Sequence, residues 1–198
     1  MNLPNKISLV RIFMIPLFML FIIPLPNWGI LARWNAMQNN WGVIVAGVLF
    51  ILAFITDAID GKIARKYNLV TDFGKFLDPV ADKLLVAAAI IALVARGSLN
   101  GWFAAIILGR ELLITGFRMV VSQKGVVVAA NMWGKWKTVF QTIAIAVMIF
   151  ETKFCQWFSW YPSTITIGDI FMTIAVLLTI ISGVIYVKDN FHLIGKEL

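Results

Sequence analysis

The sequence predicts an all-α integral membrane protein, a bundle of six transmembrane helices that forms a single domain over residues 1–198. Hydrophobic residues make up 61% of the chain and charged residues only 14%, whereas soluble domains are about 45–50% apolar and about 25% charged. The mean hydropathy is +0.89. Six apolar segments also come close to the roughly 20 residues that a membrane-spanning helix needs. A soluble core could not bury this much apolar surface, so lipid is the expected solvent.

The six expected spans fill most of the chain and leave no room for a separate soluble domain. They lie at about 7–25, 41–60, 76–96, 101–120, 134–151 and 168–187. The first segment has no small-residue cleavage signal, so it is expected to be a retained helix. The segment from Pro24 to Asn40 is expected to be an outer loop, and Asp169 is expected to cap the last span.

Basic residues set the expected orientation. An even number of spans places both termini on one side, and with the N-terminus inside, the outer loops keep only Arg33, Arg96 and Lys153. The cytoplasmic ends then collect Lys6, Arg11, Lys62, Arg65, Lys66, Lys75, Arg118, Lys124, Lys135, Lys137, Lys188 and Lys196. This asymmetry follows the positive-inside rule and predicts a multi-pass protein of the cell membrane with cytoplasmic termini.

The net charge of +7 is therefore mostly a cytoplasmic face, which attracts anionic membrane lipids. Because this charge lies at span ends and not in a separable basic module, no nucleic-acid partner is expected. Cys155 is the one cysteine, which excludes an intrachain disulfide and a cysteine metal cluster.

The stretch DAIDGKIARKYNLVTDFGKFLDPVAD, from Asp57 to Asp82, holds five of the ten acidic residues. Asp57 and Asp60 are three residues apart, and Asp78 and Asp82 are four apart, so each pair shares one helix face. The connection between the two helices is short, which predicts antiparallel neighbours. The two carboxylate pairs can then converge near the cytoplasmic end of the bundle.

A purely structural role for these carboxylates is the first alternative. Asp78 before Pro79 could be a helix N-cap, Asp72 could cap an earlier start, and salt bridges could pair others with Lys62, Arg65 or Lys83. A carboxylate in a membrane helix costs roughly 2.5–3.5 kcal/mol on insertion scales. Neither capping nor pairing explains why four carboxylates lie on the facing sides of two helices. Four oxygen ligands without His or Cys suit Mg²⁺ or Mn²⁺. Two such ions could clamp a diphosphate.

These positions resemble the complete signature of the CDP-alcohol phosphatidyltransferase family. The matching pattern is Asp57-x2-Asp60-Gly61-x2-Ala64-Arg65, then eight residues, then Gly74-x3-Asp78-x3-Asp82. The six-span layout is similar to that family over nearly the whole chain. The resemblance implies a homodimer whose active site opens to the cytoplasm. It also implies a reaction in which an alcohol displaces CMP from a CDP-linked lipid.

The resemblance also implies roles for individual residues. Two divalent cations, Mg²⁺ or Mn²⁺, would be held by Asp57, Asp60, Asp78 and Asp82. The CDP moiety of the lipid would lie against Asp60, Gly61, Ala64, Arg65 and Gly74. Asp82 would also be the catalytic base. The residue types agree with these roles, because Gly61 allows close approach of a ligand and Arg65 can fork onto a phosphate.

Three further stretches resemble the branch of the family that uses glycerol 3-phosphate: PNKISLVR (Pro4 to Arg11), GRELLITGFR (Gly109 to Arg118) and WGKWKTVFQ (Trp133 to Gln141). A dianionic acceptor needs cations beyond those that balance the aspartates, and the candidates are Arg110, Arg118, Lys135 and Lys137.

Each of these cations also has a purely structural interpretation. A guanidinium deep in an apolar span is costly, and Arg110 could pair with Glu111, although adjacent helical residues point about 100° apart. The lysines could serve only as topology anchors. Glu111 is expected to orient Arg110 or Lys137, and Thr138 and Gln141 are possible polar lining.

The predicted activity is transfer of the phosphatidyl group from CDP-diacylglycerol to glycerol 3-phosphate. Two alternatives remain at this point. One is another alcohol acceptor in the same family, such as serine, inositol phosphate or a phosphatidyl lipid. The other is a non-enzymatic transporter that uses the aspartates as a cation site, which would release no CMP with any alcohol.

Overall fold

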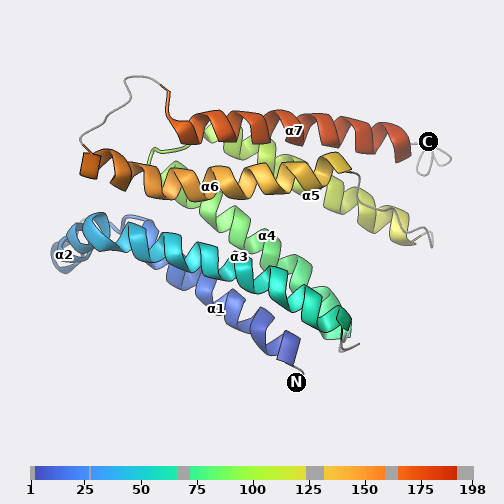
Figure 1. The fold of residues 1–198 in the computed structure, drawn as a ribbon, viewed down its shortest axis with the longest axis horizontal. Coiled ribbons are helices and arrows are strands. Elements are labelled where there is room, and N and C mark those ends of the chain that lie inside the picture. Colours follow the sequence, from blue (N-terminus) through green and yellow to red (C-terminus); the bar gives the residue numbers. More distant parts are fainter. Residues whose placement is uncertain (1–2, 27, 67–71, 124–131, 159–164, 191–198) are drawn as a thin grey trace. The chain divides into compact units, whose positions relative to one another are not determined.

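The computed structural model describes residues 3–26, 28–66, 72–123, 132–158 and 165–190, and these are almost entirely helical (Figure 1). The elements are α1 (Leu3–Ile22), α2 (Gly29–Met37), a π-helical turn (Gln38–Gly42), α3 (Val43–Lys66), α4 (Asp72–Ala95), α5 (Gly101–Gln123), α6 (Met132–Phe158) and α7 (Ile167–Asn190). Each predicted span falls largely within one of the long helices, so the all-α prediction is confirmed.

Three helical segments of the described chain are long and apolar enough to cross a membrane. They are Leu31–Thr56, Met132–Cys155 and Ile167–Asn190. The apolar part of α1, Ser8–Ile22, is shorter. The chain is therefore a helical membrane protein with several candidate spans.

The helices divide between two compact units. The first comprises residues 1–98 and 148–161, and the second comprises residues 99–147 and 162–198. Helix α6 thus contributes its first part to the second unit and its last part to the first. This division does not test the single-domain prediction for residues 1–198, which stays a prediction.

In the first unit, α1 packs against both α3 and α4. Phe18 and Phe50 meet with ring centroids 6.1 Å apart, and both side chains are fully buried. Small residues lie on the buried faces, and Phe150 packs so closely on Gly47 that a Cβ there would have no space. Helix pairs in membranes rely on such close packing, because lipid offers no hydrophobic driving force between helices.

The structure corrects the predicted outer loop, because most of the segment from Pro24 to Asn40 is helical. Helix α2 runs through the π-helical turn directly into α3. The reversal of the chain before α2 is stabilised by side chains that satisfy the last carbonyls of α1. Gln38 Nε2 donates to the carbonyls of Leu20 and Ile23, each at 2.7 Å. Arg96 Nη1 donates to the carbonyl of Ile22 at 3.0 Å.

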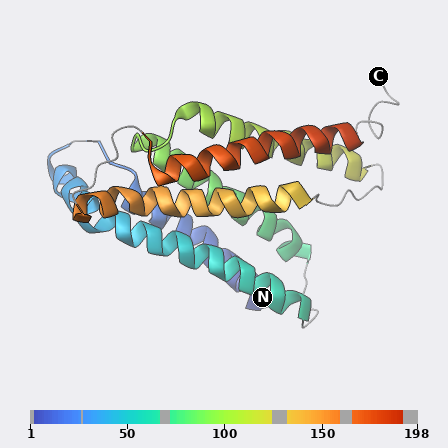
Figure 2. The same cartoon turned by 45° about the horizontal axis from the view of Figure 1, so that its top comes forward.

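In the second unit, α5 and α7 lie side by side and run in the same direction (Figures 1 and 2). Helix α7 begins with a reciprocal cap. Asp169 Oδ2 accepts hydrogen bonds from the backbone nitrogen and hydroxyl of Thr166, each at 3.0 Å, and the Thr166 hydroxyl accepts from the Asp169 nitrogen at 3.1 Å. The predicted capping role of Asp169 is confirmed, with Thr166 as its partner in a capping box.

Candidate functional site

The aspartate helix pair, α3 and α4, carries the predicted metal ligands. The two helices are in contact and antiparallel, as predicted (Figure 1). Asp57 and Asp60 lie in the last three turns of α3, and Asp78 and Asp82 lie in the first three turns of α4. Because α4 follows α3 after a short connection, these turns lie at the same end of the pair.

Most of the predicted ligand side chains lie outside the described residues, which for side chains exclude positions 57–66 and 72–79. The metal assignments of Asp57, Asp60 and Asp78 are among these. So are the nucleotide assignments, which involve Asp60, Gly61, Ala64, Arg65 and Gly74. The Asp82 side chain is described and is half-buried on α4.

One structural explanation of the carboxylates is wrong. Helix α4 begins at Asp72, so Asp78 lies in its second turn and cannot be its N-cap. The helix also continues through Pro79 without a break. Capping of the helix start therefore does not explain Asp78, and its role as a metal ligand stays a prediction.

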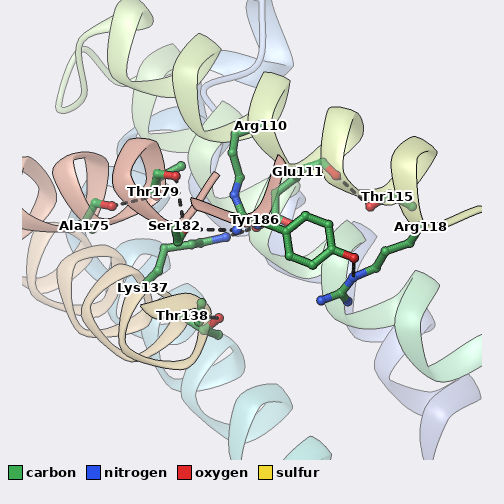
Figure 3. Close-up of polar contacts among 11 residues, drawn as sticks. Arg110, Glu111, Thr115, Arg118, Lys137, Thr138, Ala175, Thr179, Ser182 and Tyr186 are labelled. Carbon is green, nitrogen blue, oxygen red and sulfur yellow. Dashed lines mark hydrogen bonds and ion pairs between the residues drawn. The ribbon is translucent and has the colours of Figure 1, made fainter. Parts of the chain in front are cut away.

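The second unit contains the cation group, defined as Arg110 and Arg118 on α5 with Lys135 and Lys137 at the start of α6. Figure 3 shows Arg110, Arg118 and Lys137 with their polar neighbours. The structure brings Arg110 and Lys137 to a shared carboxylate and holds Arg118 through a separate contact on α7. It does not connect Lys135 to the others through the described residues.

Glu111 is the shared carboxylate. Lys137 Nζ donates to Glu111 Oε1 in an ion pair, and the Lys137 residue is only 3% exposed. Arg110 Nη1 lies 4.0 Å from the same oxygen, at the limit of an ion pair. Glu111 therefore contacts Lys137 closely and Arg110 weakly, as adjacent helical residues point in different directions.

The arginines find their closer partners on α7. Arg110 Nη2 donates to Ser182 Oγ at 3.0 Å. Arg118 Nε donates to the Tyr186 hydroxyl at 3.3 Å, and the Arg118 guanidinium carbon lies 5.2 Å from the centroid of the Tyr186 ring. The distance to the ring permits a cation–π contact as well.

The remaining polar residues of α6 differ in exposure. Lys135 is exposed, and since residues two apart on a helix point about 200° apart, it faces away from Lys137. The Thr138 hydroxyl is exposed and donates to the Gly134 carbonyl at 3.0 Å. Gln141 is 3% exposed, and in the described part of the chain its buried Oε1 has no hydrogen-bond partner. Of the two, Gln141 is thus the residue whose buried acceptor is unsatisfied within the described chain.

Sequence reasoning missed Ser182 and Tyr186. A signal was present, because Thr179, Ser182 and Tyr186 follow a helical spacing of three and four residues within an apolar segment. All three are buried, with exposures of 0%, 0% and 3%. Buried hydroxyls in such a helix need hydrogen-bond partners, and two of these meet arginines of α5.

The types of residue in the two regions favour two kinds of ligand. Two carboxylate pairs on adjacent helices suit hard cations. A group with several cations and one carboxylate suits a doubly charged anion, because its positive charge exceeds what Glu111 can balance.

Residues 1–183 match the family described as CDP-alcohol phosphatidyltransferase. A Bacillus subtilis strain 168 protein named CDP-diacylglycerol–glycerol-3-phosphate 3-phosphatidyltransferase is 42% identical over 193 residues, 96% of each chain. A protein of the same name from Rickettsia bellii is 40% identical over 94% of each chain. A probable phosphatidylglycerophosphate synthase from Mycobacterium tuberculosis is 35% identical over 98% of this chain and 84% of its own. The chain belongs to the CDP-alcohol phosphatidyltransferase family.

Proposed function

We propose that this chain is a transferase of phospholipid biosynthesis that moves the phosphatidyl group from CDP-diacylglycerol to sn-glycerol 3-phosphate. The products are phosphatidylglycerophosphate and CMP. The observation that carries the proposal is the near full-length similarity to relatives named for this reaction. The excess of cations around Glu111 supports a phosphorylated acceptor over an uncharged alcohol.

The aspartate helix pair is assigned to the CDP-lipid. Its four aspartates occupy positions at the same end of two contacting helices. Four carboxylates are a donor set that fits two Mg²⁺ or Mn²⁺ ions. When bound, the ions would offset the charge of the diphosphate and of the leaving group. Asp57, Asp60, Asp78 and Asp82 would hold them. Gly61 would let the nucleotide approach the backbone of α3, beside Asp60, Ala64, Arg65 and Gly74.

Asp82 is assigned as the catalytic base. It would accept the proton from the primary hydroxyl of glycerol 3-phosphate. That oxygen then attacks the phosphorus that carries the diacylglycerol, and the bond from this phosphorus to the oxygen of CMP breaks. The Asp82 residue is half-buried on α4, so it is accessible in part, as a proton acceptor must be.

The cation group is assigned to the phosphate of the acceptor, with distinct contributions from its members. Arg118 offers the most direct contact, because Tyr186 occupies its Nε and no described protein group accepts from its two Nη atoms. A planar pair of Nη donors matches two phosphate oxygens. Arg110 adds a second guanidinium. Lys137 is paired with Glu111, so it and the exposed Lys135 would act mainly as point charges.

The proposal includes a membrane arrangement of six spans with cytoplasmic termini and a cytoplasmic active site. Support comes from the six long helices, from the parallel direction of α5 and α7, and from the bias of basic residues. Arg110 would then lie within a span and Lys135 at the cytoplasmic end of one. The family resemblance further implies a homodimer.

The decisive assay uses the purified full-length protein in detergent with Mg²⁺ or Mn²⁺ and CDP-diacylglycerol. Released CMP is measured with glycerol 3-phosphate, serine, inositol 1-phosphate, a phosphatidyl lipid and glycerol. Glycerol 3-phosphate should give the fastest release, and glycerol should be poor because it lacks the phosphate. Fastest release with another acceptor would replace the proposed substrate within the family. No CMP release with any alcohol would favour a cation transporter.

A further inference from the structure

The buried polar face of α7 contains no group that is assigned to a metal or a substrate. It consists of Thr179, Ser182 and Tyr186. Burial of a hydroxyl group costs free energy unless the group makes a hydrogen bond. Thr179 bonds within its own helix, to the Ala175 carbonyl at 2.6 Å. Ser182 and Tyr186 instead reach across to α5, each to a different arginine of the cation group (Figure 3).

Ser182 and its neighbour Gly183 fix the position of Arg110. The Ser182 hydroxyl donates to the Thr179 carbonyl at 3.1 Å, so a lone pair of its oxygen remains to accept from Arg110 Nη2. A Cβ at position 183 would lie 3.3 Å from Arg110 Cγ, which shows that the arginine stem packs on the bare backbone of Gly183. Among the described residues, the buried Nε of Arg110 has no acceptor. An anion would be a suitable partner for such a donor.

Tyr186 fixes Arg118 in two ways. Its hydroxyl accepts from Nε, and its ring lies under the guanidinium at 5.2 Å. The ring is itself held by Phe117, with centroids 5.7 Å apart in an edge-on arrangement. Since Nε is occupied, the guanidinium is turned so that its terminal Nη atoms are the donors left for a ligand. Those two donors match two oxygens of one phosphate group.

We propose that Ser182 and Tyr186 are positioning residues for the acceptor phosphate, which hold Arg110 and Arg118 in the orientation that binds it. This inference rests on the proposed function. Arginine has many rotamers, and a guanidinium that is already ordered loses less freedom when a phosphate binds. The interaction should therefore appear in the KM for glycerol 3-phosphate and not in the KM for CDP-diacylglycerol.

The test compares Tyr186→Phe in the wild-type background and in the Arg118→Ala background. Tyr186→Phe keeps the ring and the packing on Phe117 but removes the hydroxyl. It should raise the KM for glycerol 3-phosphate about three- to tenfold, as expected for one lost hydrogen bond. In the Arg118→Ala background it should have no further effect, because the two residues act as one unit. Ser182→Ala should raise the same KM by a similar factor.

Thr179→Val is the matched control, because it removes a buried hydroxyl of α7 that bonds only its own helix within the described residues. It should leave both KM values unchanged, and thermal unfolding in detergent confirms that each variant is folded. The inference is overturned if Tyr186→Phe leaves the acceptor KM unchanged in the folded protein. It is also overturned if the effect of Tyr186→Phe persists in full without Arg118. These outcomes differ from failure of the proposed function, in which the wild type itself would release no CMP with glycerol 3-phosphate.

Discussion

The aspartate helix pair and the cation group differ in how they are assembled from the sequence. The four aspartates lie within a stretch of 26 residues, and their order and spacing follow from two neighbouring helices. The cation group combines α5 and α6, and its arginines are held by α7, 72 residues beyond Arg110 in one case. The first region can be predicted from spacing alone, whereas the second depends on tertiary packing.

Removal of divalent cations should give the largest difference between the two regions, because only the aspartate helix pair is proposed to need them. If the aspartate helix pair works through Mg²⁺ or Mn²⁺, excess chelator should abolish CMP release and either metal should restore it. Binding of glycerol 3-phosphate to the cation group has no such requirement in this account. The metal assignment fails if CMP release continues at the full rate in excess chelator.

Replacement of the proposed base should give the largest effect of any single substitution. Asp82→Asn keeps the shape of the side chain but removes its capacity to accept a proton, so turnover should fall by about 10²–10⁴-fold. CDP-lipid binding should persist. Asp189→Asn, a change in an exposed carboxylate of α7, is the control and should be neutral. Near wild-type turnover in folded Asp82→Asn would assign the proton transfer to another group.

Members of the cation group should differ in importance. Arg118→Ala should raise the KM for glycerol 3-phosphate by about ten- to one-hundredfold, because charge-assisted phosphate contacts are worth roughly 1.5–3 kcal/mol. Lys135→Ala should raise it less, because Tyr186 holds the Arg118 guanidinium in place whereas the exposed Lys135 is a point charge on a flexible stem. Arg33→Ala, an exposed arginine of α2, serves as the control. An equal or larger effect of Lys135→Ala would show that the lysine is the main phosphate contact.

Stability should respond differently in the two regions. Glu111→Gln leaves the buried Lys137 without its carboxylate, which should destabilise the protein by about 1–3 kcal/mol. Thermal unfolding in detergent measures this, with Asp189→Asn as the control. Asp82→Asn should cause a smaller loss, because that carboxylate is retained for the reaction. If Glu111→Gln unfolds at the wild-type temperature, the ion pair does not stabilise the second unit.

The sequence predicted those features that depend on interactions between residues close together in the chain. Hydropathy predicted the long helices, spacing predicted the antiparallel aspartate helices, and the acidic residue near the start of α7 was recognised as part of a cap. The expected loop from Pro24 to Asn40 was wrong, and the hydrogen bonds of Gln38 and Arg96 to the end of α1 were missed because they join residues that are distant in the sequence. Ser182 and Tyr186 were missed for the same reason, because the partners of their hydroxyl groups lie on another helix and the sequence of α7 alone does not show them.

The central claim is that the two regions bind different substrates, and a pair of KM values tests it directly. Gly61→Leu adds bulk where the nucleotide is proposed to contact α3, and Arg118→Ala removes a proposed phosphate contact on α5. Both KM values are measured for each folded variant in the CMP-release assay. Gly61→Leu should raise only the KM for CDP-diacylglycerol, and Arg118→Ala only the KM for glycerol 3-phosphate. The account is contradicted if either variant changes the other substrate's KM instead, or if Arg118→Ala leaves the acceptor KM at the wild-type value.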